Sequence, residues 1–143
     1  AQLDQRTWYE LLAHWRDGSI KQKMTRELLR FRAASPLLFQ EGSYAPLQVR
    51  GRFAEHVVAF RRHHASGTLV VIVPRLTAKL GCPPLGLIWD DTHVLLEDTD
   101  RGWREILTSA KHRIGSEVPV AELFRELPIA VLHASSVVPP AND

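Results

Sequence analysis

Cysteine is nearly absent from this sequence, because Cys82 is the single one among 143 residues, which excludes a disulfide within the chain. This usage is typical of a reducing compartment, and we expect a cytoplasmic protein. Charge of one sign is also lacking, since 18 lysines and arginines oppose 16 acidic residues. That balance argues against nucleic acid or a membrane surface as a partner. No apolar run approaches the roughly 20 residues that a membrane helix needs.

The motifs of several enzyme classes are missing too. The sequence has no Gly-rich phosphate loop, no nucleophile elbow and no Cys-x-x-Cys pair. Asp98, Asp100 and Gly102 begin like a calcium loop, but Trp103 and Ser109 stand where that loop requires glycine and glutamate. We predict a polar turn there, and we predict no metal site.

Histidines and adjacent aspartates are the remaining candidates for chemistry. The spacing of His56, His63 and His64 suits metal ligands, but a turn signal follows them and favours solvated loop histidines. Asp90 and Asp91 are neighbours, so on a strand their side chains would point to opposite faces and could not form an acid–base pair. We therefore assign no catalytic residue to this chain.

An amphipathic helix is predicted over residues 7–16. Four large apolar side chains fall on one face of it at helical spacing. They are Trp8, Leu11, Leu12 and Trp15. Thr7 and Glu10 match a capping box, and Gly18 suits the left-handed position that ends a helix.

A second helix is predicted over residues 19–34, and its lysines and arginines lie on a face that we expect to be solvated. Its apolar stripe consists of Ile20, Met24, Leu28 and Phe31. Ser19 and Gln22 suggest another capping box. Pro36 ends the helix, because proline disfavours the α conformation in the residue before it. The two helices together predict a helical hairpin over residues 1–39.

After Gly42 the sequence changes to short β-rich runs separated by turn signals. We predict strands over residues 44–49, 56–61, 69–75, 94–97, 103–108 and 129–133, with a short helix over 120–127. The β-branched run 70–73 indicates a central strand that is buried on both faces. The fold class is therefore mainly β with an N-terminal helical hairpin. We expect an antiparallel β-sandwich over residues 40–136 and a tail over 137–143.

Several short segments, taken in order, carry a resemblance to a known family. They are WRDGSIK at 15–21, then Thr25, Leu28, Leu29, Arg32, Pro36, Leu38 and Phe39, EGSYAPL at 41–47, HVVAF at 56–60, VIVPRL at 71–76, VAELF at 120–124 and PIAVL at 128–132. Together they resemble malto-oligosyltrehalose synthase, and the similarity covers roughly residues 5–134. Ser19 departs from the pattern, because the family usually has arginine there.

The resemblance implies an α-amylase-class enzyme that converts the reducing-end α-1,4 bond of a maltooligosaccharide into an α,α-1,1 bond, which gives a trehalose terminus. This intramolecular transglycosylation retains configuration and uses a carboxylate nucleophile and a carboxylic acid/base. In the family both groups lie at the ends of barrel strands, upstream of the matched region. The chain therefore resembles a C-terminal, non-catalytic portion of the enzyme, without a cofactor, and we expect it to be inactive alone.

Two residues are candidates for the rim of the substrate site. If the second helix is the last outer helix of a (β/α) barrel, its N-terminus lies near the catalytic rim, with Asp17 and Lys21 in reach of the maltooligosaccharide. Alternatively, Asp17 ends the first helix and Lys21 is a surface residue. The chain begins with Ala1 rather than methionine, so we expect it to be part of a longer protein that contains the barrel.

An independent carbohydrate-binding β-sandwich is the alternative function. Such modules offer exposed aromatic platforms, whereas Trp103 lies in a strand pattern that would bury it. Without a barrel, the apolar faces of the helical hairpin need other cover. We expect these helices to dock tightly on the sandwich, or to form a symmetric contact between two copies of the chain.

Overall fold

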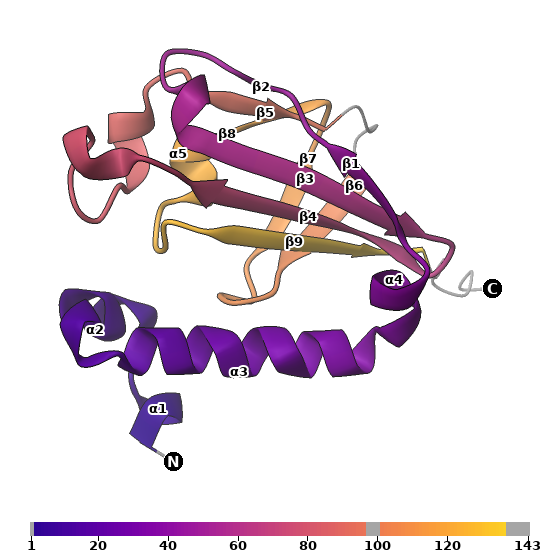
Figure 1. Cartoon of the computed structure of the whole chain (residues 1–143), viewed down its shortest axis with the longest axis horizontal. Helices are drawn as coiled ribbons and strands as arrows, with labels where there is room; N and C mark the ends of the chain where they lie inside the picture. The colour runs from indigo at the N-terminus through magenta and orange to yellow at the C-terminus, as the bar shows by residue number, and fades with distance from the viewer. Residues whose placement is uncertain (1, 97–100, 137–143) are drawn as a thin grey trace.

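The computed structural model describes residues 2–96 and 101–136 of the chain. Two antiparallel sheets form the bulk of this part, and a helical layer lies along one side of the larger sheet (Figure 1). The larger sheet has the order β1-β3-β4-β9-β6-β7, and the smaller sheet has the order β2-β5-β8. This arrangement confirms the predicted fold class, an antiparallel β-sandwich with a helical N-terminal region.

The elements have the following bounds. The strands of the larger sheet are β1 (Ser43–Pro46), β3 (Val57–His64), β4 (Gly67–Pro74), β9 (Ala130–Ser135), β6 (Arg101–Glu105) and β7 (Lys111–Ile114). Those of the smaller sheet are β2 (Val49–Arg50), β5 (His93–Leu95) and β8 (Glu117–Pro119). The α-helices are α1 (Gln2–Gln5), α2 (Trp8–Ala13), α3 (Ser19–Ala34), α4 (Pro36–Gln40) and α5 (Val120–Leu123). The short 3-10 helices are η1 (Trp15–Asp17), η2 (Ala54–His56), η3 (Thr77–Lys79) and η4 (Gly86–Trp89).

Strand β4 lies at the centre of the larger sheet, paired with β3 on one side and β9 on the other. Its Val70 and Ile72 belong to the main core, where they meet apolar residues of the smaller sheet. Leu69 points to the opposite face and packs with Phe31 of α3. Val70 and Ile72 are buried against the smaller sheet, whereas Val71 and Val73 on the helical side are half-buried, so the predicted burial on both faces is confirmed only in part.

The helical layer docks on the larger sheet through its apolar face. Trp8 and Ile20 cluster with Leu107 and Leu127, which come from the sandwich. The indole Nε1 of Trp8 also donates a hydrogen bond to the backbone oxygen of Leu107, at 2.9 Å. Tight docking on the sandwich, one of the two expected outcomes for the hairpin, is thus observed.

The first helix is shorter than predicted. It ends at Ala13, and η1 then turns the chain, so that Trp15 leaves the buried face and is 47% exposed. The predicted capping box at Ser19 is wrong as well, since Gly18 occupies the N-cap of α3 and no side chain caps it. Gly18 does adopt the predicted left-handed conformation, with φ of 79°.

Other boundaries differ from the prediction for local reasons. Pro36 ends α3 as expected, but it also begins α4, because the fixed φ of proline suits the first turn of a helix. The run 44–49 is divided between β1 and β2, which belong to different sheets. The predicted helix over 120–127 ends at Leu123. The predicted strand 94–97 is observed as β5, and Glu97 and the tail 137–143 lie outside the described residues.

The capping box of α2 is confirmed and gives a first stability prediction. The Thr7 hydroxyl accepts from the Glu10 N–H at 3.2 Å, and the Glu10 carboxylate accepts from the Thr7 N–H at 2.8 Å. Thr7→Ala should lower the free energy of unfolding by about 1 kcal/mol, since it leaves a helix-end N–H without its partner. Urea titration followed by circular dichroism measures the loss. Thr7→Ser, which keeps the hydroxyl, is the control and should retain most of the stability.

Candidate functional site

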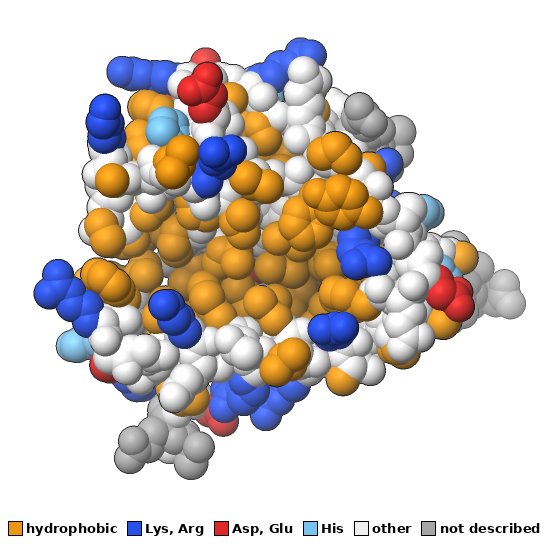
Figure 2. Space-filling view, viewed as in Figure 1, with side chains coloured by type: hydrophobic (Ala, Val, Ile, Leu, Met, Phe, Trp, Pro, Cys, Tyr) orange, Lys and Arg blue, Asp and Glu red, His pale blue; other side chains and the backbone are white. Residues whose placement is uncertain are grey.

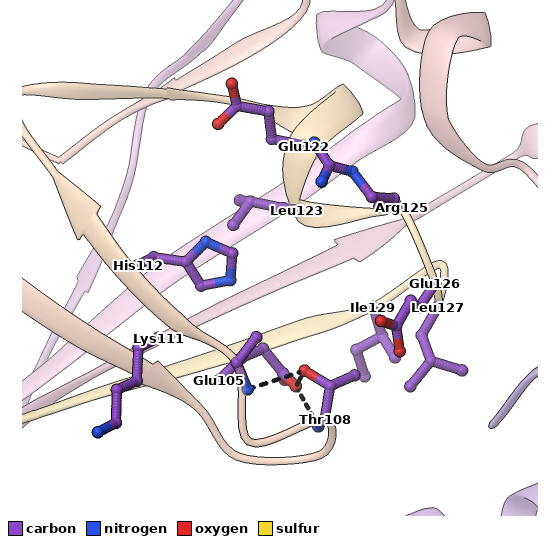
Figure 3. A pocket seen from close by; sticks show the side chains of 11 residues that line it. Glu105, Thr108, Lys111, His112, Glu122, Leu123, Arg125, Glu126, Leu127 and Ile129 are labelled. Carbon is purple, nitrogen blue, oxygen red and sulfur yellow. Dashed lines mark hydrogen bonds between the residues drawn. The ribbon is translucent and has the colours of Figure 1, made fainter. Parts of the chain in front are cut away.

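A polar pocket lies between the β6–β7 hairpin and the segment that follows α5 (Figure 3). Its volume is about 290 Å³. The polar side chains that line it are Glu105, Thr108, Lys111, His112, Glu122, Arg125 and Glu126. These residues come from two segments that are brought together when β9 pairs with β6.

Glu105 is buried at the base of this pocket, and both oxygens of its carboxylate accept hydrogen bonds from neighbouring residues. One oxygen, Oε2, accepts from the Thr108 N–H at 2.6 Å and from the Thr108 hydroxyl at 2.8 Å. The other, Oε1, accepts from the Val131 N–H at 3.1 Å. The carboxylate thus fixes the turn after β6 to strand β9. Glu105 lies two positions after Trp103 on the same strand, and side chains two positions apart point to the same face of a sheet. This spacing is the sequence signal that would have placed Glu105 on the buried face.

The other carboxylates of the pocket do not complete an acid–base pair. In Figure 3 those of Glu122 and Glu126 lie apart from each other and from Glu105. A retaining glycosidase needs two carboxyl groups roughly 5–5.5 Å apart, facing the same bond. The exposed side chains of Lys111 and Arg125 add donors at the pocket mouth. The arrangement can bind a polar group, and the described carboxylates of this pocket do not face one another as a catalytic pair would (Figure 3).

The two predicted rim residues lie near the beginning of α3. Asp17 holds the turn between the helices, because its Oδ1 accepts from the Ser19 N–H at 2.8 Å and its Oδ2 lies 3.4 Å from the Arg6 guanidinium. Lys21 is exposed on the first turn of α3. Among the described contacts none joins Asp17 to Lys21. A role for either residue at a sugar site stays a prediction, whereas the structural role of Asp17 is observed.

The hydrogen bonds at Asp17 predict a pH dependence. The backbone N–H of Ser19, with Arg6 adding to it, lowers the pKa of the Asp17 carboxyl below its ordinary value. A depressed pKa means that the contribution to stability is present above about pH 4 and is lost as the pH falls through the folded-state value. Asp17→Asn should therefore melt below the parent at neutral pH, and the difference should shrink on acidification. Thermal unfolding from neutral to strongly acidic pH checks this; a difference that grows in acid would contradict it.

The remaining candidates form no site in the described part of the chain. His63 and His64 lie on β3 rather than in a loop, and they contact Thr68 and Ser66, each at 2.8 Å. No group of three metal-ligating side chains occurs among the described residues. Asp98 and Asp100, considered for calcium, fall outside those residues.

The adjacent aspartates hold a loop instead of acting as a pair. Asp91 Oδ1 accepts from the Arg52 N–H at 2.8 Å, and Asp90 lies 3.4 Å from the Arg52 guanidinium. Trp89 and Trp103 are both buried, so neither offers the exposed platform of a carbohydrate-binding module. Within the described residues, no helix is long and apolar enough to span a membrane.

Known proteins similar to this chain, in sequence and in structure, are named as one kind of enzyme. Over 112 residues, 78% of its length, the chain is 35% identical to proteins from two strains of Mycobacterium tuberculosis that are named as maltooligosyl trehalose synthases. A solved structure of a variant of maltooligosyltrehalose synthase from Arthrobacter ramosus superposes on 87% of the chain, with a TM-score of 0.62 and 30% identity. This chain is a homologue of a segment of the maltooligosyl trehalose synthases. No protein-family model matches it.

The match concerns a small part of those proteins. The chain spans 13% of the length of the M. tuberculosis maltooligosyl trehalose synthases and 16% of the Arthrobacter chain. The structural match nevertheless covers 87% of this chain, so it includes residues of both the helical layer and the sandwich. It confirms the resemblance predicted from the sequence segments.

Proposed function

We propose that this chain is the C-terminal, non-catalytic portion of a cytoplasmic maltooligosyltrehalose synthase. The complete enzyme would convert the reducing-end α-1,4 bond of a maltooligosaccharide into the α,α-1,1 bond of a trehalose terminus. The observation that carries the proposal is the similarity in both sequence and fold over 87% of the chain to one short part of such an enzyme.

The chemistry of the described residues supports a non-catalytic role. Glu105, the buried carboxylate of the polar pocket, is occupied by three hydrogen bonds. Glu122 and Glu126 are separated from it in the same pocket (Figure 3). The transglycosylation needs a nucleophile and an acid/base that face the same bond. We infer that these groups belong to the part of the longer protein that this chain does not span.

A chimera tests this proposal directly. The segment of the M. tuberculosis relative that matches this chain is replaced by residues 1–143, and trehalose-ended products are measured from a maltooligosaccharide. The chimera is expected to keep the activity of the relative within an order of magnitude, whereas the relative without any such segment should lose it. An inactive chimera that folds as well as the relative would count against the proposal.

The chain by itself is expected to give no turnover. Removing the catalytic groups of such an enzyme leaves no nucleophile to form the glycosyl intermediate. Purified residues 1–143 and the chimera are incubated with the same maltooligosaccharide, and the products are separated by chromatography. Trehalose-ended product made by the purified chain, free of contaminating enzyme, would overturn the assignment of catalysis to another part of the protein.

A further inference from the structure

An apolar hollow opens on the face of the larger sheet that carries the helical layer. Figure 2 shows hydrophobic side chains gathered in a recess above α3, with Lys and Arg side chains along its edge. The helices cover the sheet around Leu69 and Val131 but leave the neighbouring part of β3 and β4 open. We define the apolar hollow by Val58, Phe60, Val71 and Val73 of these strands, with Leu28 on α3.

The strand register places these side chains on one face. Phe60 is paired with Val71 and Val58 with Val73, and side chains that are paired across antiparallel strands point the same way. Val71 also packs with Phe31 and Leu69 under the helices, which fixes the hollow on the helical side of the sheet. Val58 is 40% exposed, and Phe60, Val71 and Val73 are half-buried. A contiguous apolar surface of this kind is typical of an interface.

The edge of the hollow is cationic. The Arg62 guanidinium donates to the backbone oxygen of Phe39 at 2.9 Å, and it lies 5.9 Å from the centre of the Phe39 ring. Arg32 lies 6.0 Å from the same ring. Lys21 is seven residues before Leu28 and therefore stands on the same side of α3. In Figure 2 the acidic side chains lie away from the recess.

We propose that the apolar hollow is the docking surface for the remaining part of the longer enzyme, through an apolar patch of that part bordered by carboxylates. A second copy of this chain is a poorer occupant, because two copies joined face to face would oppose their cationic edges. The relatives carry the extra chain that could supply the partner, since this chain spans 13% of their length. This inference rests on the proposed function and adds to it the surface through which the two parts meet.

The accessibility of an introduced cysteine tests whether the rest of the enzyme covers the apolar hollow. In a Cys82→Ser background, Val58→Cys is labelled with a maleimide in the isolated chain and in the chimera. Leu87→Cys is the matched control, because Leu87 is an exposed apolar residue of η4, outside the hollow. The expected result is at least tenfold slower labelling of Val58→Cys in the chimera, with Leu87→Cys labelled equally fast in both.

A second set of variants tests whether the cationic edge of the hollow contributes to docking. In the chimera at low salt, Lys21→Glu should speed the labelling of Val58→Cys, since it opposes the carboxylates of the partner. Lys111→Glu makes the same charge reversal on β7, at the opposite edge of the larger sheet from β1 and β3, and as the control it should change the rate little. Both positions are exposed, so neither substitution threatens the fold.

Three outcomes separate the possibilities. Equal labelling of Val58→Cys in both proteins would overturn the docking surface, even if the chimera makes trehalose-ended products and the proposed function stands. Protection that already appears in the isolated chain and grows with its concentration would assign the hollow to a second copy. An inactive, folded chimera in which Val58→Cys is still protected would contradict the proposed function and leave the docking surface supported.

Discussion

Replacing Ile72 by aspartate is expected to leave most of the chain unfolded at room temperature. Ile72 is completely buried, and it lies between Ala59 of β3 and Ala130 of β9. A carboxylate at this position has no partner in the apolar core between the sheets, so it must either remain charged in a medium of low polarity or take up a proton. We expect a loss of at least about 5 kcal/mol, which reaches the lower end of the roughly 5–15 kcal/mol by which domains are stable.

Two controls separate burial from other effects of this substitution. Ile72→Val removes one methylene group and should cost about 1 kcal/mol. Leu87→Asp places the same carboxylate on an exposed side chain and should cost little. Circular dichroism and urea titration of the three variants give the comparison. A melting temperature of Ile72→Asp within a few degrees of the parent would show that β4 is not the central strand of a packed sandwich.

The position of β4 at the centre of the larger sheet could be predicted from its own residues, because a continuous apolar run is unfavourable at an exposed edge. A continuous β-branched run is typical of a strand with apolar cover, and β4 has the smaller sheet on one side and, around Leu69, the helical layer on the other. Local signals also placed the Thr7 capping box and the left-handed Gly18 correctly. These features depend on residues close together in the chain, so the sequence pattern contains most of the information.

The misplaced features depend on contacts between distant segments. The apolar spacing put Trp8 and Trp15 on one helical face, but α2 ends at Ala13, and the 3-10 turn η1 that follows leaves Trp15 exposed. Strand β7 was missed because it is short and rich in polar residues, and β8 because it has only three residues and ends in proline; their pairing with β6 and β5 defines them. Propensity is weak in such segments, and tertiary pairing decides their structure.

The polar pocket was missed for a similar reason. Glu105 and Glu122 are 17 positions apart and carry no recognisable motif, and they reach one cavity only when β9 pairs with β6 and brings the segment around α5 beside the β6–β7 hairpin. The rim residues Asp17 and Lys21 were predicted from the resemblance to an enzyme family, and their role at a sugar site stays a prediction. What the structure adds is a local role for Asp17 in the turn before α3, and the exposure of Lys21 on the first turn of that helix.

Trp8→Ala should be the most damaging change in the helical layer. Trp8 is 8% exposed, and its ring packs with Leu11 and Ile20 against Leu107. The substitution removes this apolar area, and it also leaves the Leu107 carbonyl without the indole N–H that it accepts at 2.9 Å. Large-to-small changes of buried tryptophan cost about 3–5 kcal/mol, because the cavity closes only in part. The short helix α2 cannot compensate, since isolated helices of this length are unstable in water.

The second tryptophan of the hairpin provides the matched control. Trp15 is 47% exposed, and Trp15→Ala should lower the free energy of unfolding by less than about 1 kcal/mol. Trp8→Phe keeps much of the apolar area but removes the N–H donor, so its loss should fall between those of Trp8→Ala and Trp15→Ala. Urea titration followed by circular dichroism measures all three without relying on tryptophan fluorescence. If Trp8→Ala costs no more than Trp15→Ala, the helices do not depend on the sandwich for their cover, and the docking of α2 on Leu107 is wrong.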